Sequence, residues 1–286
     1  MSLTLFYYEF ALLVVVALGW LTGRWLVQRY RGRSGLDGRS PEEPEPGSER
    51  LTDAIGFVGG AYGILLGLLL VFAVGHFVDT RQVSREEAIT AAALFNAVNP
   101  YPAESRDPLR HDLVCYMRSA ATDDWTAAQQ GDLTGSENTN AYAMSVQRQI
   151  EALPQEEAVE ASNHYFVTEE ILDLAKSRQL RLLYALPEIP PVIWLVVYVS
   201  AYAFVALMVF HLGRRRWLTT LALPATTLVL AAIIGALIQL DAPFNGIGAT
   251  LRPVALEAAA TRLHDANPEP AAVWDPCERL EAEEWG

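Results

Sequence analysis

The sequence predicts an all-α integral membrane protein with four transmembrane helices in two pairs and a helical extracytoplasmic domain between spans two and three. Three observations predict this fold: four long apolar runs, arginines concentrated in two short connections, and a long polar segment with helical periodicity. The chain has 286 residues and is 51% hydrophobic. This composition fits long apolar runs joined to polar stretches better than one evenly patterned core.

The first apolar run extends from Phe10 to Leu21. Glu9 precedes it and Trp25 follows it, whereas a signal peptide has a cationic region before its core and a small-residue cleavage site after it. We therefore expect a retained membrane helix. Three further runs have roughly 20 residues each, which is enough to cross the hydrocarbon core. These runs are Ile55 to Phe77, Val192 to Leu212 and Leu218 to Leu240.

Arginines predict the orientation, because basic residues in short loops remain in the cytoplasm. Five arginines lie between the first two spans, and Arg214, Arg215 and Arg216 lie between the last two. Both termini and the long segment between spans two and three are therefore expected outside the cytoplasm.

The expected segments follow from these boundaries. They are a first transmembrane helix (1–28), a cytoplasmic linker (29–50), a second transmembrane helix (51–78), an extracytoplasmic helical domain (79–189), a third transmembrane helix (190–213), a cytoplasmic turn with the fourth transmembrane helix (214–240), an amphipathic interfacial segment (241–264) and an acidic tail (265–286). Within the domain, apolar residues at helical spacing predict four helices. One continues the second span as a rod to about Val98, and the others run from about Pro108 to Ala121, Ala141 to Leu153 and Gln155 to Leu186.

The second span carries a line of glycines that leaves one helix face without side chains. Another helix can approach such a face closely. Two interpretations remain open: the face packs against a neighbouring span of the same chain, or it forms an oligomer axis or pore wall. The glycines are Gly59, Gly63, Gly67 and Gly75, with Gly56 and Gly60 beside the start of the line.

Polar residues near the outer ends of the spans are candidates for a pore rim. Acids there favour cations, while the arginines at the inner ends make the inner rim basic. The charges of the two rims therefore do not predict a single ion preference. His76 and Asp79 lie one helical turn apart and are either a protonation-sensitive pair or two separate surface residues. The candidate rim residues are Glu9, His76, Asp79, Asp241 and Asn245.

Asp241 also begins a tight turn that ends at Gly246 and precedes an amphipathic stretch. The simpler interpretation is a turn at the outer mouth followed by a helix lying along the membrane interface. The other interpretation is a part of a pore vestibule.

The chain has two cysteines, Cys115 and Cys277, and the expected topology places both where disulfides persist. A bond between them would attach the acidic tail to the domain. Two free thiols are the alternative, because the sequence does not show that the two alpha carbons lie close enough for a bridge.

Composition and motifs also argue against several function classes. The net charge of -13 argues against a nucleic-acid partner, since phosphate binding needs clustered basic residues. The five histidines are scattered, and the sequence contains no H-E-x-x-H, C-x-x-C, G-x-S-x-G or glycine-rich phosphate loop. We therefore expect no catalytic residues, metal ligands or cofactor, and as partners the lipid bilayer, further copies of the chain and inorganic ions.

Three motifs resemble a known family of bacterial membrane proteins with a domain of unknown function labelled bestrophin-like. They are the stretch from Tyr62 to Ala73, the stretch from Arg85 to Phe95, and the turn from Leu240 to Gly246. The resemblance covers about Leu51 to Ala260, although the family often has arginine and serine where this chain has Ala242 and Asn245. It implies two membrane pairs around a helical domain in the bacterial inner membrane and, through its label, a link to bestrophin anion channels.

Together these observations favour a homo-oligomeric, ion-channel-like protein with the glycine-lined second span near its axis. The alternative is a non-conducting envelope scaffold or sensor that binds a partner through its outside domain.

Overall fold

A computed structural model describes residues 3–33, 48–154, 158–212, 216–245 and 250–278, and within these ranges it is helical without a β-strand. Most of the expected linker, the centre of the arginine-rich turn and the end of the expected tail lie outside the described residues. Contacts divide the chain into two units. The apolar unit comprises Met1–His76, Pro187–Ala242 and Gly246–Gly248, and the polar unit comprises Phe77–Leu186, Pro243–Asn245 and Ala249–Gly286.

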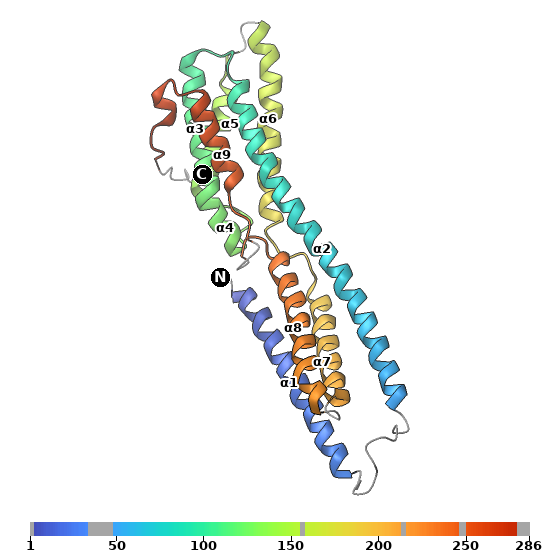
Figure 1. The fold of residues 1–286 in the computed structure, drawn as a ribbon. Helices are drawn as coiled ribbons and strands as arrows, with labels where there is room; N and C mark the ends of the chain where they lie inside the picture. Colours follow the sequence, from blue (N-terminus) through green and yellow to red (C-terminus); the bar gives the residue numbers. More distant parts are fainter. Residues whose placement is uncertain (1–2, 34–47, 155–157, 213–215, 246–249, 279–286) are drawn as a thin grey trace, which may run out of the picture. The chain divides into compact units, whose positions relative to one another are not determined.

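Four helices build the apolar unit: α1 (Leu3–Arg33), the first half of α2 (Ser48–Ala97), α7 (Pro191–Leu212) and α8 (Arg216–Asp241) (Figure 1). Each contains a stretch long and apolar enough to cross a membrane. α7 begins at a proline, whose fixed φ suits the first turn of a helix. The four helices correspond to the four apolar runs of the sequence.

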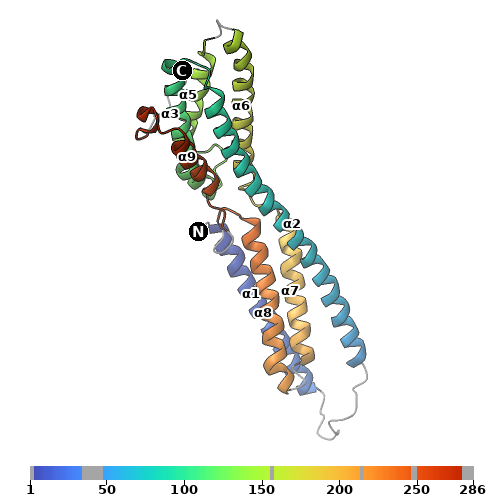
Figure 2. The same ribbon diagram turned by 45° about the horizontal axis from the view of Figure 1, so that its top comes forward.

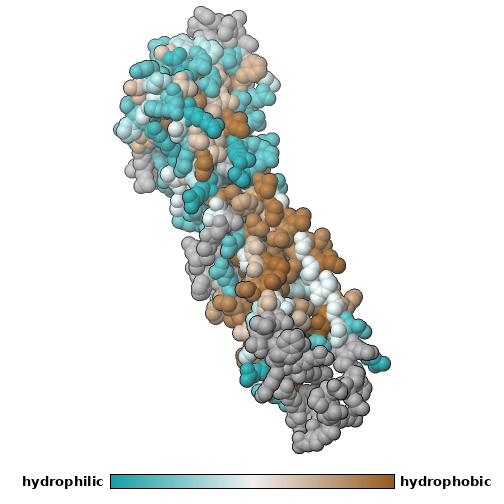
Figure 3. Space-filling view, in the orientation of Figure 1, coloured by the Kyte–Doolittle hydropathy of each residue, from teal (hydrophilic) through white to brown (hydrophobic). Residues whose placement is uncertain are grey.

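Close packing between α1 and α7 forms the core of this unit. Gly23 of α1 lies against α7, where an added Cβ would lie 2.5 Å from Cβ of Val209. Ala201, Ile234 and Leu237 are fully buried between the helices. Large apolar side chains cover the outside of the unit, and Phe57 and Val71 are 77% and 73% exposed (Figure 3). Such a surface suits contact with lipid or with other protein chains.

The polar unit contains the second half of α2 and a set of shorter elements (Figure 2). These are α3 (Ala103–Ser119), the π-helix η1 (Ala120–Asp124), α4 (Trp125–Gln130), α5 (Glu137–Glu151), α6 (Ala158–Leu183), α9 (Val254–Ala266) and the 3-10 helix η2 (Ala271–Trp274). Leu94, Phe95, Leu113 and Tyr142 lie in its core. The four predicted helices are present, while η1 and α4 form where the sequence suggested a loop.

α2 is one helix of 50 residues, as the lack of helix breakers after its apolar run predicts. Side chains from two other helices bond to carbonyls near its C-terminus, where carbonyls have no partner within the helix. The Arg110 Nε donates to the Phe95 carbonyl at 3.1 Å, and the Asn163 amide donates to the Ala97 carbonyl at 2.6 Å.

The C-terminal part differs from the expected interfacial segment and acidic tail. α9 buries Leu256 and Leu263 in the core of the polar unit, so its apolar side faces protein. Val273 of the expected tail is also buried in that core. An amphipathic pattern indicates that one face of the helix contacts an apolar surface, but it does not distinguish lipid from protein.

Candidate functional site

The glycine line of α2 faces open space over most of its length. An added Cβ would meet no heavy atom of the described chain within 4 Å at five of the six glycines. The exception is Gly59, where a Cβ would lie 2.8 Å from the Phe204 ring. Packing against the same chain therefore explains Gly59 alone. The glycines of the open face are Gly56, Gly60, Gly63, Gly67 and Gly75.

A face of α2 beside the glycine line holds the helix against α7. Tyr62 and Leu66, both 4% exposed, belong to the core of the apolar unit. The Tyr62 hydroxyl donates to the Val197 carbonyl at 3.1 Å, and the Tyr62 and Phe204 rings lie 6.3 Å apart. Because Tyr62 and Leu66 are one turn apart, they lie on one face of α2, and this face is only about 60° around the helix from Gly59 and Gly63. Their contacts hold α2 in a rotation that leaves Gly63 and Gly67 uncovered by the described residues.

Asp241 is buried and holds a turn in place. Its carboxylate accepts hydrogen bonds from the backbone N–H groups of Glu188 and Ile189 at 3.0 and 2.9 Å, and from the Trp194 indole at 3.4 Å. Only 4% of the residue is exposed. This position differs from the exposed rim acid expected from the sequence, because three donors surround the carboxylate inside the apolar unit.

The other four candidate rim residues lie in different settings. The His76 ring nitrogen Nδ1 lies 2.7 Å from Glu188 Oε2, which belongs to the segment just before α7. Asp79 is exposed, Glu9 is half-buried on α1, and Asn245 donates to the Gln129 carbonyl at 2.8 Å.

A buried ion cluster in the polar unit had no counterpart in the sequence analysis. Arg181 of α6 bonds to Glu87 of α2 and, at 2.7 Å, to Asp124 of η1. Arg178 makes a two-point contact with Asp124 at 2.8 and 3.0 Å, and the Tyr116 hydroxyl donates to Glu87 at 2.8 Å. Glu87, Asp124 and Arg181 are fully buried. The cluster therefore ties α2, α6 and η1 together.

The charges of this cluster compensate one another, with two arginines facing two carboxylates. Burial opposes ionisation of Asp124, but the hydrogen bonds and charge of Arg178 and the charge of Arg181 outweigh it and hold the Asp124 pKa below its usual value. Burial and the neighbouring Glu87 raise the pKa of Tyr116 well above its usual value. The cluster thus consists of two arginines, two carboxylates and a neutral tyrosine, which is a structural arrangement more than a catalytic one.

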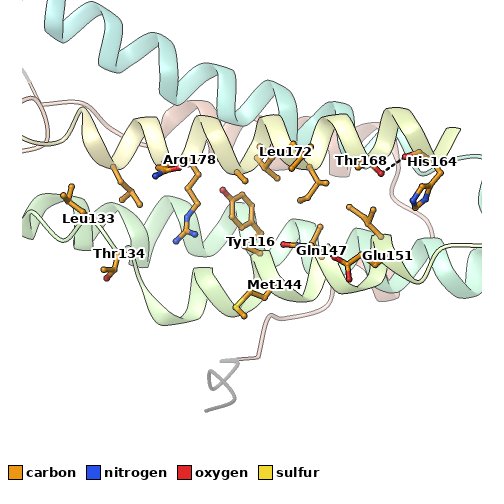
Figure 4. A pocket seen from close by; sticks show the side chains of 18 residues that line it. Tyr116, Leu133, Thr134, Met144, Gln147, Glu151, His164, Thr168, Leu172 and Arg178 are labelled. Atoms are coloured by element: carbon orange, nitrogen blue, oxygen red, sulfur yellow. Dashed lines mark hydrogen bonds between the residues drawn. The ribbon is translucent and has the colours of Figure 1, made fainter. Parts of the chain in front are cut away.

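A groove of about 510 Å³ runs between α5 and α6. Its lining includes the apolar side chains of Val146 and Ile150. Thr134 lies toward one end of the groove and His164 toward the other, with Arg178 and Glu151 between them (Figure 4). Among the described residues, no group of three His, Cys, Asp or Glu side chains is arranged to hold a metal ion. The groove suits an apolar or amphipathic occupant.

Cys115 of α3 and Cys277, which follows η2, are joined by a disulfide with alpha carbons 5.5 Å apart. The bond anchors the C-terminal segment to the core of the polar unit. Nearby, the Trp274 indole donates to the Asn267 carbonyl at 2.8 Å, and the Trp274 and His264 rings lie 4.8 Å apart.

Comparison with known proteins identifies the family. The profile of the Bestrophin-like domain matches residues 51–252, which include nearly all of α2, most of the polar unit, α7 and α8. The chain belongs to the Bestrophin-like family. No curated protein matches this bestrophin-like sequence.

Solved structures of a bacterial bestrophin homologue from Klebsiella pneumoniae share the fold. One of them, obtained by zinc phasing, is 16% identical, with a TM-score of 0.65 over 88% of this chain and 97% of the other. A point mutant of the homologue is 17% identical, with a TM-score of 0.65 over 93% and 98%. At this identity the likeness extends to the fold alone. The chain is thus an all-helical, membrane-spanning bestrophin-like protein.

Proposed function

We propose that this protein is a homo-oligomeric, ion-channel-like membrane protein in which the open glycine face of α2 lies at or near the axis. One observation carries the proposal: at five glycines of α2 an added Cβ would meet no heavy atom of the described residues within 4 Å, while Tyr62 and Leu66 hold a neighbouring face of the helix against α7. Glycines weaken a helix by roughly 1 kcal/mol each relative to alanine. This loss of helix stability is explained if the face must allow another helix to approach closely or must leave space for a path.

The face is uncharged from Gly56 to Gly75, so the ends of the path would determine ion preference. Asp241 is occupied by three donors, which leaves Glu9 and Asp79 as the candidate rim acids. The family resemblance links such a protein to inorganic ions. Lipid and further copies of the chain would be its other partners.

We also propose the bacterial inner membrane as its location, with both termini and the polar unit outside the cytoplasm. The arginines of the two short connections support this orientation. The pairing of Cys115 with Cys277 supports it independently, because disulfides persist mainly outside the cytoplasm.

Two glycine substitutions on one helix test the proposal. Gly63→Leu should leave the monomer folded, because a side chain there meets open space, and should reduce the size of the detergent-purified particle. Gly59→Leu is the matched control. It should lower the stability of the monomer, because an added Cβ already lies 2.8 Å from the edge of the Phe204 ring and the ring must move.

Particle size by light scattering and helicity by circular dichroism separate the outcomes. A Gly63→Leu protein that loses stability as Gly59→Leu does would contradict an open face. A monomeric wild-type particle would contradict the oligomer itself.

A non-conducting scaffold or sensor is the second candidate, because the groove between α5 and α6 is large enough for a ligand or for a side chain of a partner. Well-folded oligomers that carry no current across a range of voltage and pH would favour this candidate.

A further inference from the structure

α1 has an exposed face near the end of its apolar stretch, on the side opposite its contact with α7. Gly19 and Gly23 lie against α7, where an added Cβ would be 3.2 and 2.5 Å from side-chain atoms of Val205 and Val209. At roughly 100° per residue, the exposed residues occupy the other half of the helix circumference. We define the Trp–Arg face of α1 as Trp20, Leu21, Arg24, Trp25, Gln28 and Arg29, all of which are exposed.

Two tryptophan–arginine pairs border this face. The Arg24 guanidinium lies 5.2 Å from the centre of the Trp20 ring, and the Arg29 guanidinium lies 4.9 Å from the centre of the Trp25 ring. Trp20 and Trp25 are 41% and 51% exposed, so both pairs are open to their surroundings. An arginine stacked on an aromatic ring keeps N–H groups at its edge free, and these groups match the oxygens of a phosphate.

The positive charge of this part of α1 is not compensated nearby. Between Phe10 and Arg33 the sequence has four arginines and no aspartate or glutamate. Among the described residues, no carboxylate forms an ion pair with Arg24 or Arg29. An anionic partner therefore complements this face, whereas an apolar partner would leave both guanidinium groups without an acceptor.

The length of α1 brings both charges to the depth of the lipid headgroups. The stretch Tyr7–Arg29 is long and apolar enough to cross a membrane. Counted from Tyr7 at roughly 1.5 Å per residue, Arg24 and Arg29 lie about 26 and 33 Å along the helix, and a hydrocarbon core is about 30 Å thick. Arg24 can extend its charged end into the headgroup layer while its methylene groups remain beside Leu21.

Within the apolar unit, α1 lies away from the glycine line of α2. It packs against α7 and α8, and Figures 1 and 2 both show these two helices between α1 and the first half of α2. With the glycine line near the axis, α1 lies on the side of the bundle that faces lipid. The choice of lipid over a second copy of the chain rests on the proposed function in this respect.

We propose that each tryptophan–arginine pair of α1 binds the phosphate of an anionic phospholipid, whose acyl chains lie along Leu18 and Leu21. In the proposed orientation these lipids belong to the cytoplasmic leaflet, which carries the anionic headgroups that attract basic residues beside a membrane span. A zwitterionic lipid has the same phosphate, but its own cationic group competes for it. The face therefore distinguishes lipids by net charge.

Native mass spectrometry of the full chain in detergent tests the proposal, with phosphatidylglycerol and phosphatidylcholine of matched acyl chains added in equal, limiting amounts. Wild type should retain several-fold more phosphatidylglycerol than phosphatidylcholine. Arg24→Gln and Arg29→Gln should each lower the retained phosphatidylglycerol, and their combination should lower it further. Arg81→Gln combined with Arg85→Gln is the matched control, because it removes two exposed arginines from the polar unit and should leave lipid retention unchanged.

Equal retention of the two lipids by wild type, or unchanged retention by the combined Arg24→Gln and Arg29→Gln variant, would overturn the proposal. Displacement of the retained lipid by glycerol phosphate would overturn it too, by showing a site for free phosphate. If the combined variant dissociated into smaller particles, the face would be a contact between copies and not a lipid site. A monomeric wild type that still prefers phosphatidylglycerol through both arginines would refute the proposed function and support the lipid sites.

Discussion

Arg181 is the residue on which the interior of the polar unit depends most. It is fully buried, bonds to Glu87 and Asp124, and lies 5.6 Å from the centre of the Trp125 ring. Removing one partner of a buried ion pair leaves an uncompensated charge, which typically destabilises a protein by about 3–5 kcal/mol. The chain therefore depends on a side chain that composition alone would assign to the surface.

Arg181→Met should reduce the free energy of unfolding by about 3–5 kcal/mol, measured by denaturant titration of the full chain followed by circular dichroism. Arg81→Met is the control. Arg81 is exposed on the same unit, so its replacement should change stability by less than about 0.5 kcal/mol. Equal losses in the two variants would contradict a structural role for the cluster.

The same cluster predicts a dependence on acid. The Asp124 pKa lies below its usual value of 3.8 in the folded protein, so the unfolded chain takes up this proton at a higher pH than the folded chain. The stabilisation by Asp124 is therefore complete above the unfolded pKa and is lost as the pH falls through the folded pKa. Unfolding titrations at several pH values should show wild type losing its advantage over Asp124→Asn below about pH 4. Parallel curves for the two proteins would refute this assignment.

At the scale of elements, the local spacing of apolar residues predicted the helices. The apolar runs located α1, α7 and α8, and the absence of breakers predicted α2 as one rod. The glycine line was visible too, but the hydrogen bond that holds this part of α2 against α7 joins Tyr62 to Val197, 135 residues away. Nothing local in the sequence indicates that pairing.

The ion cluster, the burial of α9 and the burial of Asp241 could not be predicted for the same reason: each depends on contacts between residues far apart in the chain. Glu87 and Arg181 are 94 residues apart, and each alone has the polarity of a surface residue. The apolar face of α9 was consistent with lipid until Leu256 was seen in the core of the polar unit. Asp241 resembled a rim acid because its three donors come from Glu188, Ile189 and Trp194, which precede it by about fifty residues in the chain.

The disulfide gives a prediction for the C-terminal element. Because Cys115 and Cys277 are joined, denatured and unreduced protein should contain no free thiol, and reduction should make the segment after α9 more accessible to protease. Loss of a native disulfide usually costs about 2–4 kcal/mol. Two free thiols in protein isolated from the membrane without reductant would contradict the bond.

At the scale of the whole molecule, the orientation in the membrane can be tested with one introduced thiol. Gln130 is exposed at the end of α4, so Gln130→Cys should react with a membrane-impermeant reagent in cells whose outer membrane has been made permeable. The account predicts labelling equal to that of a known extracytoplasmic control. Labelling only after lysis would place the polar unit in the cytoplasm and reverse the orientation.

The central claim is that the open face of α2 lies along an ion path between copies of the chain. Single-channel recording of purified protein in planar bilayers tests it most directly, with Gly63→Leu compared with wild type at equal amounts of folded protein. The account predicts discrete currents from wild type and their loss, or a clear change in conductance, in Gly63→Leu. Wild-type oligomers that never conduct, or currents that Gly63→Leu leaves unchanged, would contradict it.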